Sequence, residues 1–168
     1  FSVGLNGVGT KAVNALSEAF EIASFREGKS VRALFGQGEL INAGKPESSA
    51  EKPGTFVRFV PDPQLFPKYA YDLAVVRRRL WNYAYLNRSL TVTLNGERFK
   101  AENGLLDLLK EEVQEDNLYD PIHASAKHVE FSFTHTDRYG EEHFSYVNGH
   151  YTNDGGSHLS AFREGVLK

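Results

Sequence analysis

The chain has 168 residues, of which 40% are hydrophobic and 24% charged, an ordinary composition for a globular protein. It contains no cysteine, which excludes disulfide frameworks, thiolate zinc sites and cysteine nucleophiles. The net charge of −3 argues against a main role in neutralising DNA phosphates, and no run of about 18 apolar residues predicts a membrane span. Because the chain lacks methionine and begins with Phe1, we expect a piece of a longer protein.

The first elements expected are a glycine-rich loop, Gly4 to Thr10, and a helix that follows it. The helix is predicted from an apolar face at helical spacing, formed by Val8, Ala12, Ala15, Leu16 and Ala19. Closely spaced glycines let backbone N–H groups approach an anion, and a helix start adds unpaired N–H groups. The order GxxGxG matches neither a P-loop nor a dinucleotide fingerprint. The loop therefore predicts a phosphate site, with a flexible hinge as the alternative.

A β-rich segment is expected next. Strands are predicted over 20–25 and 30–35, joined by a hairpin turn at 26–29. Residues 43–54 collect Gly, Pro, Ser, Lys and Glu, which predicts a surface loop. The alternating run 55–60 predicts a further strand, ended by the prolines that follow it.

A long helix and a second hairpin are predicted beyond this segment. The helix runs over 72–85, with Asp72 as its N-terminal cap. Strands over 90–94 and 97–101 flank Asn95-Gly96, a strong hairpin signal. A short helix is predicted over 105–113.

The composition changes over 102–120, which is rich in acidic residues, and Pro121 is the predicted domain boundary. Beyond it we expect strands over 128–136 and 142–147, joined at 138–140, and a last helix from near Ser157. All six histidines lie in the last third of the chain, but their spacing does not favour a metal site. No GxSxG motif suggests a nucleophilic serine, and no catalytic residue is predicted.

Four segments in this order resemble the B subunits of bacterial type II topoisomerases, which belong to the GHKL (Bergerat-fold) ATPase superfamily. They are the glycine loop and helix over 4–17, the strand and turn over 54–62, the arginine-rich helix over 77–87, and the "N…GGSH" stretch over 147–158. Asn6, Thr10-Lys11 and the Gly-Ser-His ending favour the topoisomerase IV branch over the gyrase branch.

The resemblance implies residue roles. It assigns the ATP phosphates to the backbone N–H groups of the glycine loop, namely Gly4, Leu5, Asn6, Gly7, Val8 and Gly9. It places Thr55 at the adenine end of the pocket, and Arg26 at the pocket border that contacts aminocoumarin inhibitors. The family's catalytic Glu, its magnesium-binding Asn and its adenine-reading Asp precede the glycine loop, and its γ-phosphate Lys follows residue 168. No catalytic or metal-binding residue is therefore expected here, and this piece alone is expected to be inactive.

The resemblance also implies an α+β fold with a mixed sheet and helices on one face. It assigns 1–120 to the C-terminal part of the GHKL ATPase domain and 121–168 to the start of a transducer domain. The longer protein is expected to be cytoplasmic and to use ATP and Mg²⁺ for DNA strand passage. Its expected partners are DNA, topoisomerase A subunits and a second copy of the ATPase subunit. The alternatives are another GHKL ATPase, such as a mismatch-repair protein or a sensor kinase, and a non-catalytic β-rich binding module.

Overall fold

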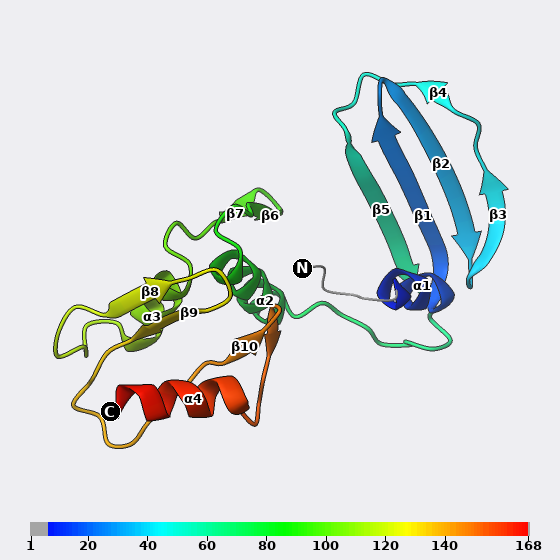
Figure 1. Ribbon diagram of the computed structural model, residues 1–168. Helices are drawn as coiled ribbons and strands as arrows, with labels where there is room; N and C mark the ends of the chain where they lie inside the picture. The colour runs from blue at the N-terminus through cyan, green and yellow to red at the C-terminus, as the bar shows by residue number, and fades with distance from the viewer. Residues whose placement is uncertain (1–6, 168) are drawn as a thin grey trace. The chain divides into compact units, whose positions relative to one another are not determined.

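The computed structural model describes residues 7–167, which form two compact units that divide between Ala70 and Tyr71 (Figure 1). We call residues 7–70 the N-terminal unit and residues 71–167 the C-terminal unit. Helices and strands occur in both, so the predicted α+β class is confirmed. Every strand pair in the described part of the chain is antiparallel, so the mixed sheet that the resemblance implies is not found in residues 7–167.

The N-terminal unit consists of one helix and one sheet. Its elements are α1 (Val8–Ala15), β1 (Ser17–Arg26), β2 (Lys29–Gly36), β3 (Glu39–Ala43), β4 (Glu47–Ser48) and β5 (Gly54–Pro61). The sheet has the order β3-β2-β1-β5, and the short β4 pairs with β2. The strands predicted over 20–25, 30–35 and 55–60 are confirmed. No strand was predicted for the segment that forms β3, and β4 lies within the predicted loop.

The hairpin turn between β1 and β2 has the predicted conformation. Glu27 and Gly28 both adopt positive φ, at 54° and 71°. Two successive left-handed residues make the type I′ turn whose twist matches that of paired strands.

The predicted extent of the first helix is wrong. The helix ends at Ala15, and Ala19 lies in β1. The backbone N–H of Asp62 donates to the carbonyl of Leu16 at 3.0 Å, so the chain is already paired with the end of β5 at this point. A tertiary hydrogen bond thus ends a helix that apolar spacing alone would continue.

One face of the sheet is apolar. Phe20 on β1 lies between Phe35 and Phe59, and its ring meets that of Phe35 edge-on at 6.1 Å between centroids. On the same face, two residues along β1, Ile22 lies beside Val57, which is 46% exposed. Side chains alternate between faces along a strand, so the half-exposed apolar surface around Phe20 and Ile22 gives way to Ser24 further along β1.

The opposite face carries charged and aromatic side chains. Ala23 lies between Arg32 and Phe56, and the Arg32 guanidinium carbon lies 5.9 Å from the centre of the Phe56 ring. Arg32 also pairs with Glu21. These contacts leave Ala23 only 1% exposed.

The C-terminal unit combines three helices with three two-stranded hairpins. Its elements are α2 (Leu73–Leu86), β6 (Val92–Leu94), β7 (Glu97–Phe99), α3 (Leu105–Val113), β8 (Ile122–Ser125), β9 (Glu130–Phe133), β10 (Tyr146–Val147), β11 (His150–Tyr151) and α4 (Ser157–Val166). Strand β6 pairs with β7, β8 with β9, and β10 with β11.

Local signals predicted the helices and the first hairpin of this unit correctly. The Asp72 carboxylate accepts hydrogen bonds from Ala74 N and Val75 N at 2.9 and 3.3 Å, as expected of an N-cap. Asn95 and Gly96 form the turn between β6 and β7 with positive φ at both positions. Helices α3 and α4 begin at the predicted residues.

The predicted pairing of 128–136 with 142–147 is wrong. Strand β9 pairs with β8, and β10 pairs with β11 across Asn148 and Gly149, which both have positive φ. The Asn-Gly turn holds β10 in a local hairpin, so it is not available to β9.

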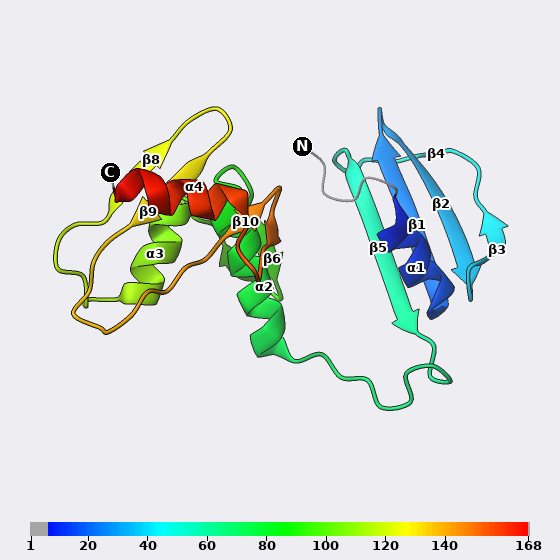
Figure 2. The same cartoon turned by 60° about the horizontal axis from the view of Figure 1, so that its bottom comes forward.

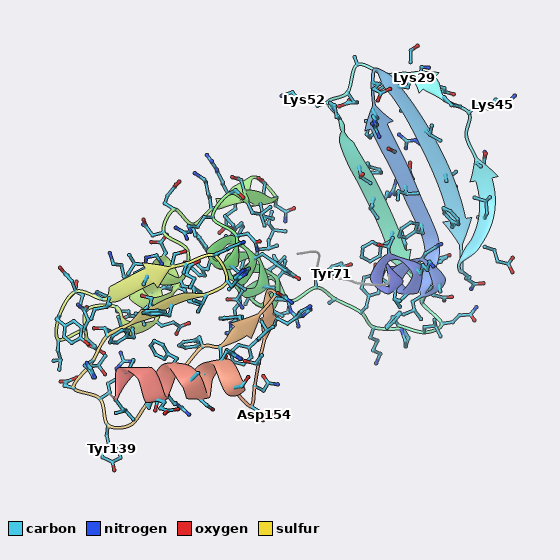
Figure 3. The ribbon with its side chains drawn as sticks, viewed as in Figure 1. Lys29, Lys45, Lys52, Tyr71, Tyr139 and Asp154 are labelled. Atoms are coloured by element: carbon cyan, nitrogen blue, oxygen red, sulfur yellow. The ribbon has the colours of Figure 1, made fainter. Side chains whose placement is uncertain are left out.

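The core of the C-terminal unit lies where α2, β7 and α3 meet. Its buried members are Ala84, Tyr85, Phe99, Ala101 and Leu108. Helix α4 lies beside β9, where Phe162 contacts the rings of Phe131 and Phe133 at 5.1 and 5.8 Å between centroids (Figure 2). In the loop between β9 and β10, Tyr139 extends fully into solvent (Figure 3).

The predicted boundary at Pro121 lies inside the C-terminal unit. Asn117 forms a bridge with Thr136, and Leu105 on α3 donates a backbone hydrogen bond to Glu130 on β9. These contacts join the two sides of position 121 into one compact unit. The assignment of 1–120 and 121–168 to an ATPase domain and a transducer domain stays a prediction.

Candidate nucleotide site

The start of α1 has the features of an anion site. Gly7 precedes the helix in a left-handed conformation, with φ of 60° and ψ of 20°. No side chain caps this helix start within the described residues, and the first turn contains no acidic residue. The unpaired N–H groups and the positive end of the helix dipole therefore favour a negatively charged ligand here. Val8 is 59% exposed, so the helix start is open to solvent.

The two described glycines of the loop differ in their conformational needs. A Cβ atom on either Gly7 or Gly9 meets nothing within 4 Å, but only Gly7 has a positive φ. Gly9 lies in the first turn of α1 with an ordinary helical backbone. The backbone conformation at position 7 therefore explains why a glycine stands there. The backbone conformation at position 9 gives no such reason. The other predicted loop residues, Gly4, Leu5 and Asn6, lie outside the described residues.

A partly buried polar cluster joins α1 to the sheet. We call Ser17, Gln37 and Asp62 the α1 anchor. The Ser17 hydroxyl donates to the carbonyl of Val13 at 2.6 Å, and Gln37 N donates to the carbonyl of Ser17 at 2.8 Å. The Asp62 carboxylate accepts from the Gln37 side-chain amide at 2.7 Å and from Gln64 N at 2.8 Å.

The α1 anchor was not recognised in the sequence. Ser17 is 1% exposed and Asp62 5% exposed, so these polar groups have been removed from water and depend on their partners. The only signal of this cluster in the sequence is Asp62, which lies between two prolines at the end of a predicted strand. That pattern indicates a turn and does not by itself indicate a buried carboxylate. Since the cluster holds the C-terminal end of α1, it fixes the direction in which the open helix start points.

Thr55 and Arg26 lie at the other end of the sheet. Thr55 on β5 pairs with Ser24 on β1, on the same face as Ile22. Arg26 is the last residue of β1, and its guanidinium Nε lies 3.0 Å from a carboxylate oxygen of Glu27. The Arg26 side chain is 82% exposed, so it is free to contact a ligand.

The predicted site residues are therefore divided between two places. Helix α1 joins the sheet where β1 begins and β5 ends, whereas Arg26 and Thr55 lie near the opposite ends of these strands (Figure 1). The ten residues of β1 span about 30 Å. The apolar face with its two hydroxyls, Ser24 and Thr55, suits a flat base, and the start of α1 suits phosphates. The structure does not bring the two parts into direct contact.

Neither a metal centre nor a membrane span is found in the described part of the chain. Residues 7–167 contain no group of three or more His, Asp or Glu side chains placed to hold a metal ion. None of the helices in this range has the length and apolar character needed to cross a bilayer.

Comparison with known proteins places the chain in a class. The family model described as DNA gyrase B matches residues 104–168. The B subunit of DNA topoisomerase 4 from Borreliella burgdorferi is 51% identical over all of this chain and 28% of its own length. The B subunit of DNA gyrase from Thermotoga maritima is 34% identical over 99% of this chain and 29% of its own length.

Solved structures agree with these relatives. The 43K ATPase domain of Thermus thermophilus gyrase B, solved with an aminocoumarin, matches with a TM-score of 0.81 and 35% identity. That match covers 95% of this chain and 47% of the ATPase-domain chain.

The chain is therefore homologous to the B subunits of type II DNA topoisomerases. Among these relatives are topoisomerase IV and gyrase proteins, and the chain spans less than a third of the length of the two named above. The resemblance drawn from the four sequence motifs is confirmed.

Proposed function

We propose that this chain forms part of the ATPase subunit of a type II DNA topoisomerase, and of topoisomerase IV in preference to gyrase. The observation that carries the proposal is the 51% identity to the topoisomerase 4 relative over the whole chain. Two gyrase B relatives that match nearly the whole chain are 34% and 38% identical to it. Identity of this kind favours the topoisomerase prediction over the mismatch-repair, sensor-kinase and non-catalytic alternatives.

The arrangement of the N-terminal unit supports a role in holding ATP. The uncapped start of α1 offers N–H groups to phosphates, and Gly7 provides the turn that leads into it. The face that carries Thr55 offers hydroxyl groups beside apolar side chains for the base. Arg26 lies at the end of β1, where an exposed guanidinium suits a pocket border.

The remaining parts of the proposal concern the longer protein. ATP and Mg²⁺ are its proposed cofactors, and the catalytic base and magnesium ligand are proposed to come from segments that precede the glycine loop in the family. DNA, topoisomerase A subunits and a second copy of the ATPase subunit are its proposed partners in a heterotetramer. The proposed location is the cytoplasm, where the chromosome of a bacterium lies.

A DNA topology assay tests the proposal. The full-length protein that contains this chain is combined with its topoisomerase A partner and given interlinked circular DNA, relaxed DNA and ATP. We expect ATP-dependent separation of the interlinked circles without introduction of negative supercoils. Supercoiling of the relaxed DNA would show a gyrase, and no ATP-dependent change in either substrate would contradict the proposal.

A further inference from the structure

A groove in the C-terminal unit lies outside the proposed nucleotide site. It has a volume of about 310 Å³ and is formed by α2, α3 and the segment that follows β7. The side chains that decide its chemistry are Trp81, Tyr85, Lys100, Asp107, Lys110 and Glu111. An aromatic wall and charged groups of both signs thus share one small depression.

The aromatic wall is rigid. The rings of Trp81 and Tyr85 are stacked, with centroids 5.3 Å apart and planes inclined by 19°. The ring of Phe99, which is completely buried, packs against Trp81 with planes inclined by 70° and centroids 5.3 Å apart. Trp81 itself is only partly buried, so it remains accessible in the groove. The face of an indole ring is the best aromatic surface for a cation, and a planar cation also stacks on it.

The charges of the groove are not equally available. The Asp107 carboxylate accepts hydrogen bonds from the backbone N–H groups of Glu102 and Asn103 at 3.0 and 2.8 Å. Lys100 pairs with Glu102 at 2.5 Å, so it already has a partner. The Glu111 side chain forms no hydrogen bond or ion pair with any residue in the described range 7–167. Glu111 is therefore the carboxylate that is open to a new partner.

The field at the Tyr85 end of the groove is negative. Partial burial raises the pKa of the Tyr85 hydroxyl, and the carboxylates of Glu111, Asp107 and Glu112 raise it further. Carboxylates raise the pKa of a phenol because they disfavour its anion, and the same field favours a bound cation. Lys110 lies on α3 together with these carboxylates, and its positive charge acts against this field.

We propose that this groove binds the guanidinium group of an arginine side chain from a basic partner protein, stacked on Trp81 and paired with Glu111. Arginine fits better than lysine because its planar group stacks on a ring while its N–H groups reach a carboxylate. The proposal concerns a protein partner and is independent of the nucleotide site.

The single tryptophan of the chain makes the proposal directly measurable. Trp81 is the only tryptophan, so its fluorescence reports on the groove alone. The 168-residue chain is titrated with N-acetyl-arginine amide and, in parallel, with N-acetyl-citrulline amide, which has the same shape without the charge. We expect a saturable fluorescence change with the arginine compound only.

Three variants separate the proposed contact from a general charge effect. Glu111→Gln is expected to weaken binding of the arginine compound by about threefold. Glu115→Gln, an exposed carboxylate that does not line the groove, is expected to leave binding unchanged. Lys110→Gln is expected to strengthen it. Equal responses to arginine and citrulline, unchanged binding in Glu111→Gln, or a saturable response to inorganic phosphate that Lys110→Gln abolishes would each overturn the proposal.

Discussion

Glu130 on β9 accepts a hydrogen bond from the backbone N–H of Leu105 at the start of α3, at 3.3 Å. The carboxylate of Glu130 also contacts His123 at 3.1 Å and Arg88 at 3.4 Å. One carboxylate thus joins the end of α2, the start of α3 and the β8–β9 hairpin, and it occupies the position at a helix N-terminus where an anion is most favourable. Partners from three separate segments make Glu130 the polar centre of the C-terminal unit.

Replacement of Gly104 tests how tightly Glu130 fits against α3. A Cβ atom on Gly104 would lie 2.8 Å from a carboxylate oxygen of Glu130 and 3.3 Å from the carbonyl of Tyr85, and the residue has a φ of 62°. We expect Gly104→Ala to lower the free energy of unfolding by about 2 kcal/mol or more, measured by urea denaturation. Gly96→Ala is the matched control, because Gly96 has a φ of 89° but an open surrounding. A loss no greater than that of the control would contradict the steric argument.

Asp107 makes the stability of the C-terminal unit depend on pH. Partial burial acts to raise the pKa of Asp107, but hydrogen bonds from Asn103 and Glu102 and the charge of Lys110 outweigh it, so the pKa lies below its usual value. A lowered carboxyl pKa stabilises the fold above the unfolded value of about 3.9, and this stabilisation is lost as the pH falls through the folded pKa.

The variant Asp107→Asn should therefore lower the free energy of unfolding by about 1 kcal/mol at pH 7, because the N–H groups of Glu102 and Asn103 lose a charged acceptor. The difference from the unmodified chain should shrink as the pH falls below about 4. Asp154→Asn, at an exposed loop position, serves as the control and should change stability little at either pH. A difference between Asp107→Asn and the unmodified chain that stays constant from pH 7 to pH 3 would show that the charge of Asp107 is unimportant.

The α1 anchor predicts a second stability effect, in the N-terminal unit. Asp62→Ala leaves the Gln37 side-chain amide and the N–H of Gln64 without their acceptor. We expect a loss of about 1.5–3 kcal/mol, because hydrogen bonds to a charged acceptor contribute about this much. Glu51→Ala, at an exposed position in the loop before β5, should cause no comparable loss. Equal urea midpoints for the two variants would contradict the proposal that Asp62 stabilises the N-terminal unit.

The two loop glycines should respond differently to alanine. Gly7→Ala places a side chain at positive φ and should weaken ATP binding to the full-length protein by at least about tenfold, or 1.4 kcal/mol. Gly9→Ala should also weaken ATP binding, by hindering the approach of a phosphate, but it should not destabilise the unliganded protein, because alanine favours a helix. Calorimetric titration with ATP and thermal unfolding without it separate the two effects. Unchanged ATP affinity in both variants would favour the hinge interpretation.

The parts of the fold that the sequence predicted correctly depend on neighbours along the chain. Asp72 caps α2 through N–H groups two and three residues ahead, and Asn95-Gly96 and Glu27-Gly28 form their turns without help from distant residues. Such features are visible in a short window of sequence.

The parts that could not be predicted depend on contacts between distant segments. The end of α1 is set by Asp62, 46 positions after Leu16, and the α1 anchor joins residues that are 25 positions apart. The pairing of β8 with β9 likewise could not be predicted, because no local pattern shows which strand lies beside β9. Among the site residues, Gly7 was predicted with its physical reason, whereas the wide separation of α1 from Thr55 appears only in three dimensions.

The most direct test of the account is phosphate release from Mg-ATP, measured for the 168-residue chain and for the full-length protein that contains it. We propose that residues of this chain hold the nucleotide, whereas the catalytic base, the magnesium ligand and the γ-phosphate cation come from other segments. Each such electrostatic contact contributes roughly 10² to 10³ in rate. We therefore expect ATP hydrolysis by the full-length protein and none above background by the chain alone. Turnover by the chain within about tenfold of the full-length protein would contradict the account and would require a catalytic base among these residues.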